Sequence, residues 1–146
     1  MRINSIAGLV LAALLVLGIS TISPAQPVRV IKVSMVSFKF IPNIIAFNEG
    51  DRVVLQLENN DDKPRPHSIA SPYFSTVDVT TRGDVKPGVA KDGWKYYMLE
   101  PGTKGEIEFI AHGRGQFSFI CALYTHASAG QTGAFIAWPT GSTLKQ

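Results

Sequence analysis

Short runs of Val, Ile, Phe and Tyr alternate with Pro, Gly, Asn and Asp along the chain from residue 26 onward. No segment there carries a long apolar repeat of 3.6 residues, which an amphipathic helix would need. Strand-length apolar runs separated by turn residues are typical of an all-β sandwich or barrel. The pattern therefore predicts an all-β fold.

The clearest strand is "GDRVVLQLENN", in which Val53, Leu55 and Leu57 alternate with Gln56 and Glu58. This alternation is that of a strand with one face in the core and one in solvent. We expect the three apolar side chains to point inward.

The first apolar run, "RVIKVSMVSFKF", is less regular. Its apolar residues fall into two sets of opposite parity, Ile31, Val33 and Met35 in the first and Val36, Phe38 and Phe40 in the second. A bulge or bend near Met35–Val36 would turn both sets toward the core, and without one a set lies outside.

Strand patterns return near the carboxyl end with "EIEFIA", "QFSFIC" and "GAFIAWP". Ile107 and Phe109 are expected to point inward. Phe117, Phe119 and Cys121 share one parity, so a core position for the phenylalanines places the thiol in the core as well. Between these strands and the earlier ones, residues 71–93 are polar and rich in Gly and Pro, and we expect a loop with one helical turn.

The first 25 residues have the layout of a secretory signal peptide. Arg2 precedes an uncharged run from Ile6 to Ile19, and small residues stand at Ser23 and Ala25. We predict cleavage after Ala25 and a single domain over residues 26–146. An uncleaved anchor helix is the alternative, although the apolar run is short for a bilayer span.

The charge of the chain excludes some partners. Without Arg2, thirteen Lys and Arg face eleven Asp and Glu, a formal charge of +2 with neutral histidines. There is no basic block or stripe, which argues against a nucleic acid partner.

Cys121 is the only cysteine, so it cannot form a disulfide within the chain. In an oxidising compartment it must be buried, paired with another chain, or occupied by a ligand. An antiparallel sandwich can bring His67, at the end of a polar break, and His126, just after Cys121, to the same end. Two imidazoles and one thiolate with a weak axial ligand form the donor set of a mononuclear blue copper site.

Two long segments resemble the cupredoxins, the blue copper proteins. They are "FKFIPNIIAFNEGDRVVLQLENNDDKPRPHSIA" and "PGTKGEIEFIAHGRGQFSFICALYTHASAGQTG". The resemblance implies a Greek-key β-sandwich with one type 1 copper ion bound by His67, Cys121 and His126. The spacing of the ligand loop is similar to that of rusticyanin.

The family's axial methionine is replaced here by Gln131. The resemblance to stellacyanin-like members implies that the amide oxygen of Gln131 is the axial ligand. The alternatives are a three-coordinate copper or a water or small ligand in that position. A harder oxygen ligand favours Cu(II), so we expect a lower reduction potential than methionine would give.

The resemblance also assigns roles beside the ligands. It places the backbone carbonyl of Pro66 on the far axial side of copper and a hydrogen bond from Ser68 to the ligand loop, which would orient His67 and tune the thiolate; the alternative is that both are ordinary turn residues. Small and apolar residues around His126 would form the docking patch for redox partners, or only pack the loop; these are Ala122, Leu123, Tyr124, Ala127 and Ala129. His112 is expected in an exposed turn, and Met98 in the core.

The function that these features imply is that of an exported, periplasmic or otherwise extracytoplasmic, monomeric one-electron carrier. Its partners would be cytochromes, an oxidase or a copper oxidoreductase. It is not expected to be an enzyme, because no nucleophile or acid–base pair is evident. The alternatives are a copper-delivery protein and a red copper protein that binds a small molecule at an open axial position.

Overall fold

The computed structural model describes residues 26–144, so the predicted leader peptide and its cleavage site lie outside the described residues. The strands are β1 (Val28–Val36), β2 (Lys39–Ile41), β3 (Ile44–Asn48), β4 (Arg52–Asn59), β5 (His67–Ala70), β6 (Thr80–Gly83), β7 (Lys86–Val89), β8 (Lys95–Leu99), β9 (Lys104–Ile110), β10 (Gly115–Ile120) and β11 (Thr132–Trp138). A 3₁₀ turn, η1 (Pro72–Ser75), follows β5. Over the same residues, the structure holds no helix with the length and apolar character that a membrane crossing requires.

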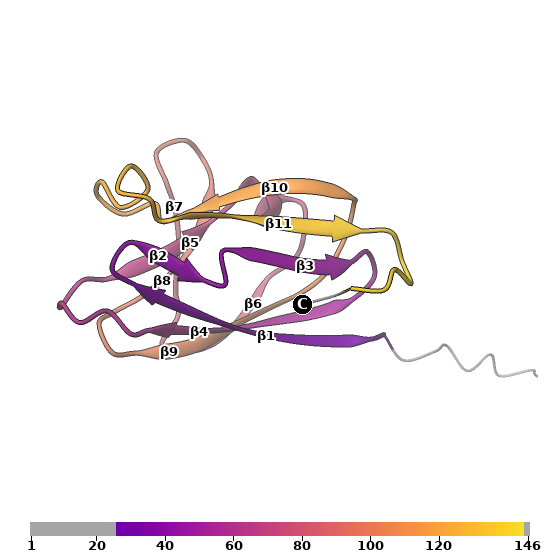
Figure 1. Cartoon of the computed structure of the whole chain (residues 1–146), viewed down its shortest axis with the longest axis horizontal. Coiled ribbons are helices and arrows are strands. Elements are labelled where there is room, and N and C mark those ends of the chain that lie inside the picture. The colour runs from indigo at the N-terminus through magenta and orange to yellow at the C-terminus, as the bar shows by residue number, and fades with distance from the viewer. Residues whose placement is uncertain (1–25, 145–146) are drawn as a thin grey trace, which may run out of the picture.

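The strands form two sheets packed face to face, as Figure 1 shows. The first sheet has the order β2-β1-β4-β9-β6, and the second has the order β3-β11-β10-β5-β8-β7. Most neighbours are antiparallel, whereas β1 pairs with β4 and β3 with β11 in parallel. The predicted all-β sandwich is confirmed.

In the first apolar run, the expected bulge or bend near Met35–Val36 is a hairpin turn directly after Val36. The chain turns at Ser37 and Phe38, both of which have positive φ, and β2 pairs back onto β1 with Phe40 opposite Met35. Ile31, Val33, Met35 and Phe40 are buried, and Val36 and Phe38 are half-buried. The turn thus reverses the strand and lets both parity sets approach the core.

Residues 71–93 are also more regular than the predicted loop. They contain η1, where one helical turn was expected, and two further strands. β6 extends the first sheet along β9, and β7 extends the second along β8. The side chains of both strands are mostly exposed, so these strands lack the apolar alternation by which the other strands were predicted.

The core between the sheets is rich in aromatic side chains. The fully buried rings are those of Phe47, Tyr73, Phe74, Phe109, Phe119 and Phe135. Their ring centroids lie close, for example 4.7 Å between Phe119 and Phe135, and such contacts add to the stabilisation from burial. Leu55, Leu57, Ile107 and Phe109 are buried as predicted.

Two smaller expectations have different outcomes. His112 is exposed beyond the end of β9, as predicted, and its backbone N–H donates to the Tyr73 hydroxyl. Met98 lies in β8 but is only half-buried, because Tyr97 and Leu99 take the two inward positions beside it.

Three connections gather at one end of the sandwich, on the left in Figure 1. They are the turn at residues 37–38, the segment 60–66 between β4 and β5, and the loop 121–131 between β10 and β11. The predicted ligands lie at or beside these connections. The fold therefore brings the two halves of the sequence together at this end.

Candidate metal centre

His67 is the first residue of β5, and its side chain is fully buried. β5 pairs with β8, and His67 lies opposite Leu99 in that ladder. The ring Nδ1 faces Gln131 Oε1 at 2.8 Å, and Nε2 lies 2.6 Å from Asp61 Oδ2. Both ring nitrogens thus have a fixed neighbour, so the ring is held in one orientation.

Cys121 directly follows β10 and is 1% exposed. Its Sγ lies 3.4 Å from the backbone nitrogen of Ser68 and 3.7 Å from the Ser68 hydroxyl. The same hydroxyl accepts from the backbone N–H of Ala122 at 3.0 Å. Ser68 therefore connects β5 to the beginning of the ligand loop.

His126 is carried by the loop 121–131, and its Nδ1 lies 3.4 Å from Cys121 Sγ. Backbone bonds close the loop on itself: the Cys121 N–H donates to the Gln131 carbonyl, and the Gln131 N–H donates to the His126 carbonyl, each at 3.0 Å. Tyr124 has positive φ and points its ring into solvent, with 83% of the residue exposed. The loop is thus compact around the cysteine and open at Tyr124.

The structure brings the three predicted ligands together. One donor atom from each of His67, Cys121 and His126 lies within 4.8 Å of the others, and all three residues are buried. Among the described residues, it is the one group of three or more His, Cys, Asp or Glu side chains placed closely enough to hold a metal ion. Two imidazoles and one thiolate fit a type 1 copper site.

Gln131 lies beside this cluster, 2.8 Å from His67 Nδ1 through its Oε1, and is fully buried. Its Nε2 is buried and has no hydrogen-bond partner among the described residues, while Oε1 faces His67 Nδ1. A carboxylate can only accept, so the proton of His67 belongs on Nε2 beside Asp61. Nδ1 and Oε1 then face each other with lone pairs, an arrangement that suits a cation bound by both atoms.

The electrostatics of the site favour metal-binding protonation states. Burial raises the pKa of the Cys121 thiol, but hydrogen bonds from His67 and Ser68 outweigh this effect and leave the pKa below its usual value. Burial and the positive charges of His67 and Arg65 hold the pKa of His126 below its usual value. A metal requires a thiolate and a neutral imidazole, and both shifts favour these forms.

His67 responds differently to the same surroundings. Burial lowers the pKa of His67, but the thiolate of Cys121 and the carboxylate of Asp61 outweigh burial, and the pKa lies above its usual value. A bound metal would take the place of the additional proton. The negative groups that raise the pKa of His67 also favour a metal cation there.

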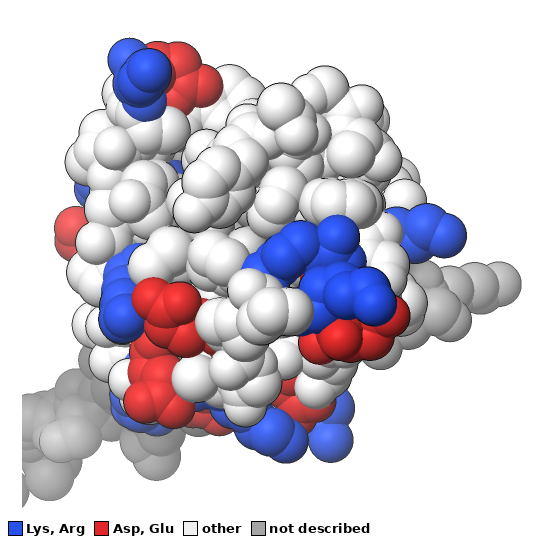
Figure 2. Space-filling model, turned by 90° about the vertical axis from the view of Figure 1, so that its left-hand side faces the viewer, with Lys and Arg blue, Asp and Glu red and all other residues white. Residues whose placement is uncertain are grey.

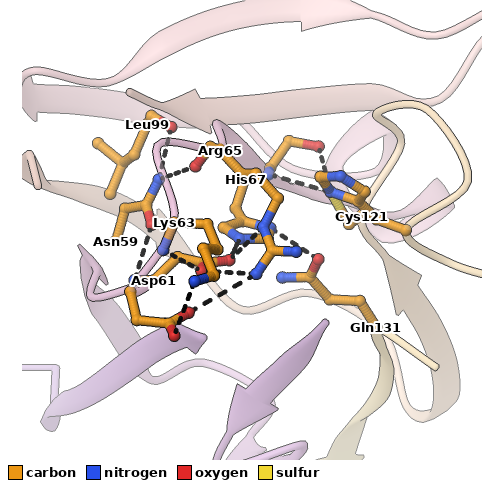
Figure 3. Close-up of polar contacts among 11 residues, drawn as sticks. Asn59, Asp61, Lys63, Arg65, His67, Leu99, Cys121 and Gln131 are labelled. Atoms are coloured by element: carbon orange, nitrogen blue, oxygen red, sulfur yellow. Dashed lines mark hydrogen bonds and ion pairs between the residues drawn. The ribbon is translucent and has the colours of Figure 1, made fainter. Parts of the chain in front are cut away.

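Sequence reasoning missed three residues beside the cluster. Asp61 contacts His67, Arg65 pairs with Asp61, and the Phe38 ring packs 4.9 Å from the His126 ring, centroid to centroid. Figure 3 shows Asp61 and Arg65 side by side next to His67. The polar run "NNDDKPRPH" resembled an ordinary loop, although an acid and an arginine four residues apart so near a ligand histidine were a possible signal.

Pro66 is half-buried immediately before β5, and its carbonyl as an axial neighbour of the metal stays a prediction. Around His126, Tyr124 is exposed and Ala122, Leu123 and Ala127 are half-buried. Figure 2 looks onto this end of the molecule and shows a broad area without charged side chains, bordered below by basic and acidic groups. An uncharged surface with an exposed aromatic ring thus adjoins the site.

Solved structures with the same fold include three auracyanins. Auracyanin B has a TM-score of 0.57 at 19% identity, covering 80% of this chain and 91% of its own. A dithionite-reduced auracyanin from the photosynthetic bacterium Roseiflexus castenholzii has a TM-score of 0.58 at 15% identity, covering 78% and 100%. Auracyanin A, a "blue" copper protein from the green thermophilic photosynthetic bacterium Chloroflexus aurantiacus, has a TM-score of 0.54 at 14% identity, covering 75% and 98%.

At these identities the likeness concerns the fold. The comparison with curated protein sequences found no match. The family model described as the cupredoxin-like domain matches residues 9–132, a range that includes His67, Cys121, His126 and Gln131. With a donor set for a single copper ion at the end of a β-sandwich, the chain belongs to the cupredoxin family of blue copper proteins.

Proposed function

We propose that this protein is an exported one-electron carrier that exchanges electrons with other redox proteins. The observation that carries the proposal is the convergence of His67, Cys121 and His126 at one buried point. Copper, when bound there, would accept and release one electron. The residues that would hold it are these three, with Gln131 as the axial ligand.

The ligands are held in a way that suits rapid electron transfer. His67 is part of the β5 ladder, and the loop carrying Cys121 and His126 is closed by its own backbone hydrogen bonds. A thiolate suits Cu(I), and imidazoles accept both copper oxidation states. A site that already has one geometry needs little rearrangement when the charge of its ion changes.

Gln131 supports the axial assignment through its burial and its orientation. Its amide oxygen faces the cluster, and its amide nitrogen points away from any hydrogen-bond partner among the described residues. An axial amide oxygen stabilises Cu(II) relative to Cu(I). We therefore assign this protein a lower potential than its Gln131→Met variant.

His126 is the side of the site at which electrons would enter and leave. His126 is 4% exposed, and its Nδ1 contacts Cys121 Sγ within the loop 121–131. The exposed Tyr124 ring lies beside it, with centroids 5.5 Å apart. A small, uncharged surface of this kind suits brief encounters with a cytochrome, an oxidase or a copper oxidoreductase.

The signal layout of residues 1–25 supports export to the periplasm or another extracytoplasmic space. Four protein donors around one ion would leave no open position for a substrate, which favours electron transfer over catalysis. The auracyanins of the same fold include one that is described as a blue copper protein, in agreement with this proposal.

The test is an absorption and electron spin resonance spectrum of the copper-loaded protein, with its reduction potential, beside the Cys121→Ser and Gln131→Met variants. We expect an intense thiolate-to-copper band that bleaches and returns reversibly on reduction and oxidation. Gln131→Met should keep the band and raise the potential by at least about 59 mV, which is a tenfold change in the ratio of Cu(II) to Cu(I) affinity.

A Cys121→Ser protein that kept the band would contradict the assignment of the site. An unchanged potential in Gln131→Met would remove Gln131 from the metal. Rapid loss of copper to a mild chelator from the wild-type protein would contradict the carrier role and favour copper delivery.

A further inference from the structure

Asp61 is an acidic residue that contacts a copper ligand from behind. Its side chain is fully buried, and its Oδ2 lies 2.6 Å from His67 Nε2, the ring nitrogen that points away from Cys121 and Gln131. The contact spans only six residues of chain, within the segment that joins β4 to β5. A buried carboxylate at this place requires explanation, because burial of a charge without partners is costly.

The remaining hydrogen bonds of Asp61 show that it is ionised. Arg65 donates twice, from Nε to Oδ2 at 3.0 Å and from Nη2 to Oδ1 at 2.7 Å, and the Lys63 backbone N–H donates to Oδ1 at 2.9 Å. Figure 3 shows this arrangement. All of its other neighbours are donors, so His67 must donate as well.

The segment around Asp61 is itself fixed. Asn59 is 1% exposed and donates from Nδ2 to the backbone carbonyls of Arg65 and Leu99, and its Oδ1 accepts from the Asp61 N–H. Asn59 therefore ties both ends of the short loop to β8. The carboxylate is held in place before any ion binds.

We propose that Asp61 is the positioning residue for the copper ligand His67, and that Asp61 and Arg65 together set the balance between Cu(II) and Cu(I). The carboxylate keeps the proton on Nε2, fixes the plane of the ring, and directs the lone pair of Nδ1 toward Cys121 and Gln131. This inference rests on the proposed function for its copper part. Carboxylates that accept from a ligand imidazole make the imidazole a stronger donor.

Arg65 gives the arrangement a second, opposing charge. Its side chain is 28% exposed, and its guanidinium carbon lies 4.4 Å from the centroid of the Phe38 ring. Phe38 in turn packs against both histidines, with centroid distances of 6.5 Å to His67 and 4.9 Å to His126. Phe38 thus holds the cation over the carboxylate and covers the rings from the β1–β2 turn.

The two charges act on the metal in opposite directions. A negative carboxylate behind His67 stabilises Cu(II) more than Cu(I), because Cu(II) carries the larger charge. The guanidinium partly cancels this effect. Removal of Asp61 and removal of Arg65 should therefore shift the reduction potential in opposite directions. If the two residues were merely structural, their removal would not be expected to give shifts of opposite sign.

The first experiment uses the wild-type protein without metal. In nitrogen-15 histidine spectra at pH 9, His67 should show a ring proton on Nε2 that exchanges slowly with water. His112 is exposed and should show no such proton, which makes it the internal reference. A proton on Nδ1 of His67, or no protected ring proton at all, would overturn the proposal without reference to copper.

The second experiment compares the Cu(II) and Cu(I) affinities of three variants by chelator competition. Asp61→Asn should lower Cu(II) affinity by about 10- to 100-fold, the range for loss of a partner behind a metal ligand. Cu(I) affinity should fall about tenfold less, which raises the potential by about 59 mV. Arg65→Gln should raise the ratio of Cu(II) to Cu(I) affinity and lower the potential.

Asp62→Asn is the matched control. This substitution removes the same charge at the next position in the sequence. The Asp62 side chain is 69% exposed and lies 3.8 Å from Arg65. It should change either affinity less than threefold. Equal effects of Asp61→Asn and Asp62→Asn, or shifts of one sign in Asp61→Asn and Arg65→Gln, would overturn the proposal. A wild-type protein that binds no copper would refute the proposed function, while the metal-free spectra would still decide the role of Asp61.

Discussion

His67 and His126 face the same sulfur, yet they are held in opposite ways. His67 belongs to a strand in the middle of a sheet, and each of its ring nitrogens has a buried neighbour. His126 belongs to a loop, and its ring lies beside Cys121 and beside the exposed ring of Tyr124. His67 is thus held by buried partners inside the sheet, whereas His126 lies in the loop next to the exposed surface.

The difference shows how the chain meets two demands on one site, a fixed ligand geometry and access for a redox partner. A buried polar network around His67 fixes geometry and charge, because the Asp61 carboxylate behind the ring is held by Arg65 and by the Lys63 N–H. The loop around His126 places the exposed Tyr124 ring beside this ligand, where a redox partner can approach. Substitutions can test this division, first at the ligands, then at the residue that joins the two sides, and last far from both.

The largest effect should come from replacement of each histidine by glycine, followed by addition of free imidazole. Both variants should lose the blue band. In His126→Gly, imidazole should enter from solvent and restore the band. In His67→Gly it should not, because Asp61 and Phe38 close that side. Absorption titrations with imidazole measure the result.

The same pair should differ in stability without metal. His67→Gly leaves a buried cavity and a carboxylate that has lost one donor, which should lower the free energy of unfolding by about 3 kcal/mol. His126→Gly should cost less, about 1 kcal/mol, because this ring is carried by a loop and its loss leaves no buried carboxylate without a donor. Denaturant unfolding measures both values, and equal costs together with equal rescue would remove the distinction between the two ligands.

A smaller effect is expected for Ser68→Ala, since Ser68 joins the β5 side to the loop. The Ala122 N–H would lose its acceptor, at a cost of about 1 to 2 kcal/mol. The Cys121 sulfur would lose a weak donor, so its electron density would rise and the reduction potential should fall. Unfolding curves and voltammetry measure the two changes.

Ser71→Ala is the control for this variant. Ser71 is also a fully buried serine and donates to the Ser118 carbonyl at 2.8 Å. It should cost similar stability and leave the potential unchanged. A potential that moved equally in both variants would show that loss of stability, and not contact with the sulfur, causes the shift.

The smallest effect lies in the first sheet, away from both ligands. The hydrogen bond from Arg52 holds the pKa of Glu108 below its ordinary value of 4.5. A lowered pKa in the folded state adds stability above pH 4.5, and this stability is lost as the pH falls through the folded value. Glu108→Gln should therefore flatten the decline of stability with acid in the metal-free protein.

Thermal unfolding between about pH 3 and pH 6 measures this slope. Glu106→Gln is the comparison, because Glu106 accepts from neutral Gln56 and lies 3.8 Å from Arg82. A steeper slope in Glu108→Gln than in the wild type would contradict the expected direction.

The sequence allowed prediction of the parts of the fold that follow an alternating pattern. Val53, Leu55 and Leu57 fill the core as expected because a strand with one buried face leaves that signature. A bulge or bend near Met35–Val36 was expected, but not its form as a hairpin turn at Ser37 and Phe38, since neither residue is one of the usual residues of positive φ. β6 and β7 were missed because they are exposed edge strands.

The site divides in the same way. Cys121 and the two histidines were predictable, because their residue types are rare in this chain and their spacing is specific. Asp61 and Arg65 were not, because acids and arginines in a polar loop are usually solvated. Their role depends on a reversal of the chain that places Asp61 behind His67, and no spacing rule gives that geometry.

The register of β1 against β4 has one further consequence. Met35 lies opposite Asn59, next to the segment of Asp61, whereas Val28 lies opposite Arg52, seven positions further along the ladder. At about 3.3 Å per residue, the described chain starts roughly 23 Å from that end, on the right in Figure 1. A purification tag, an electrode linker or a fused domain joined at residue 26 would therefore leave the Tyr124 face free, and immobilised protein should still exchange electrons through it.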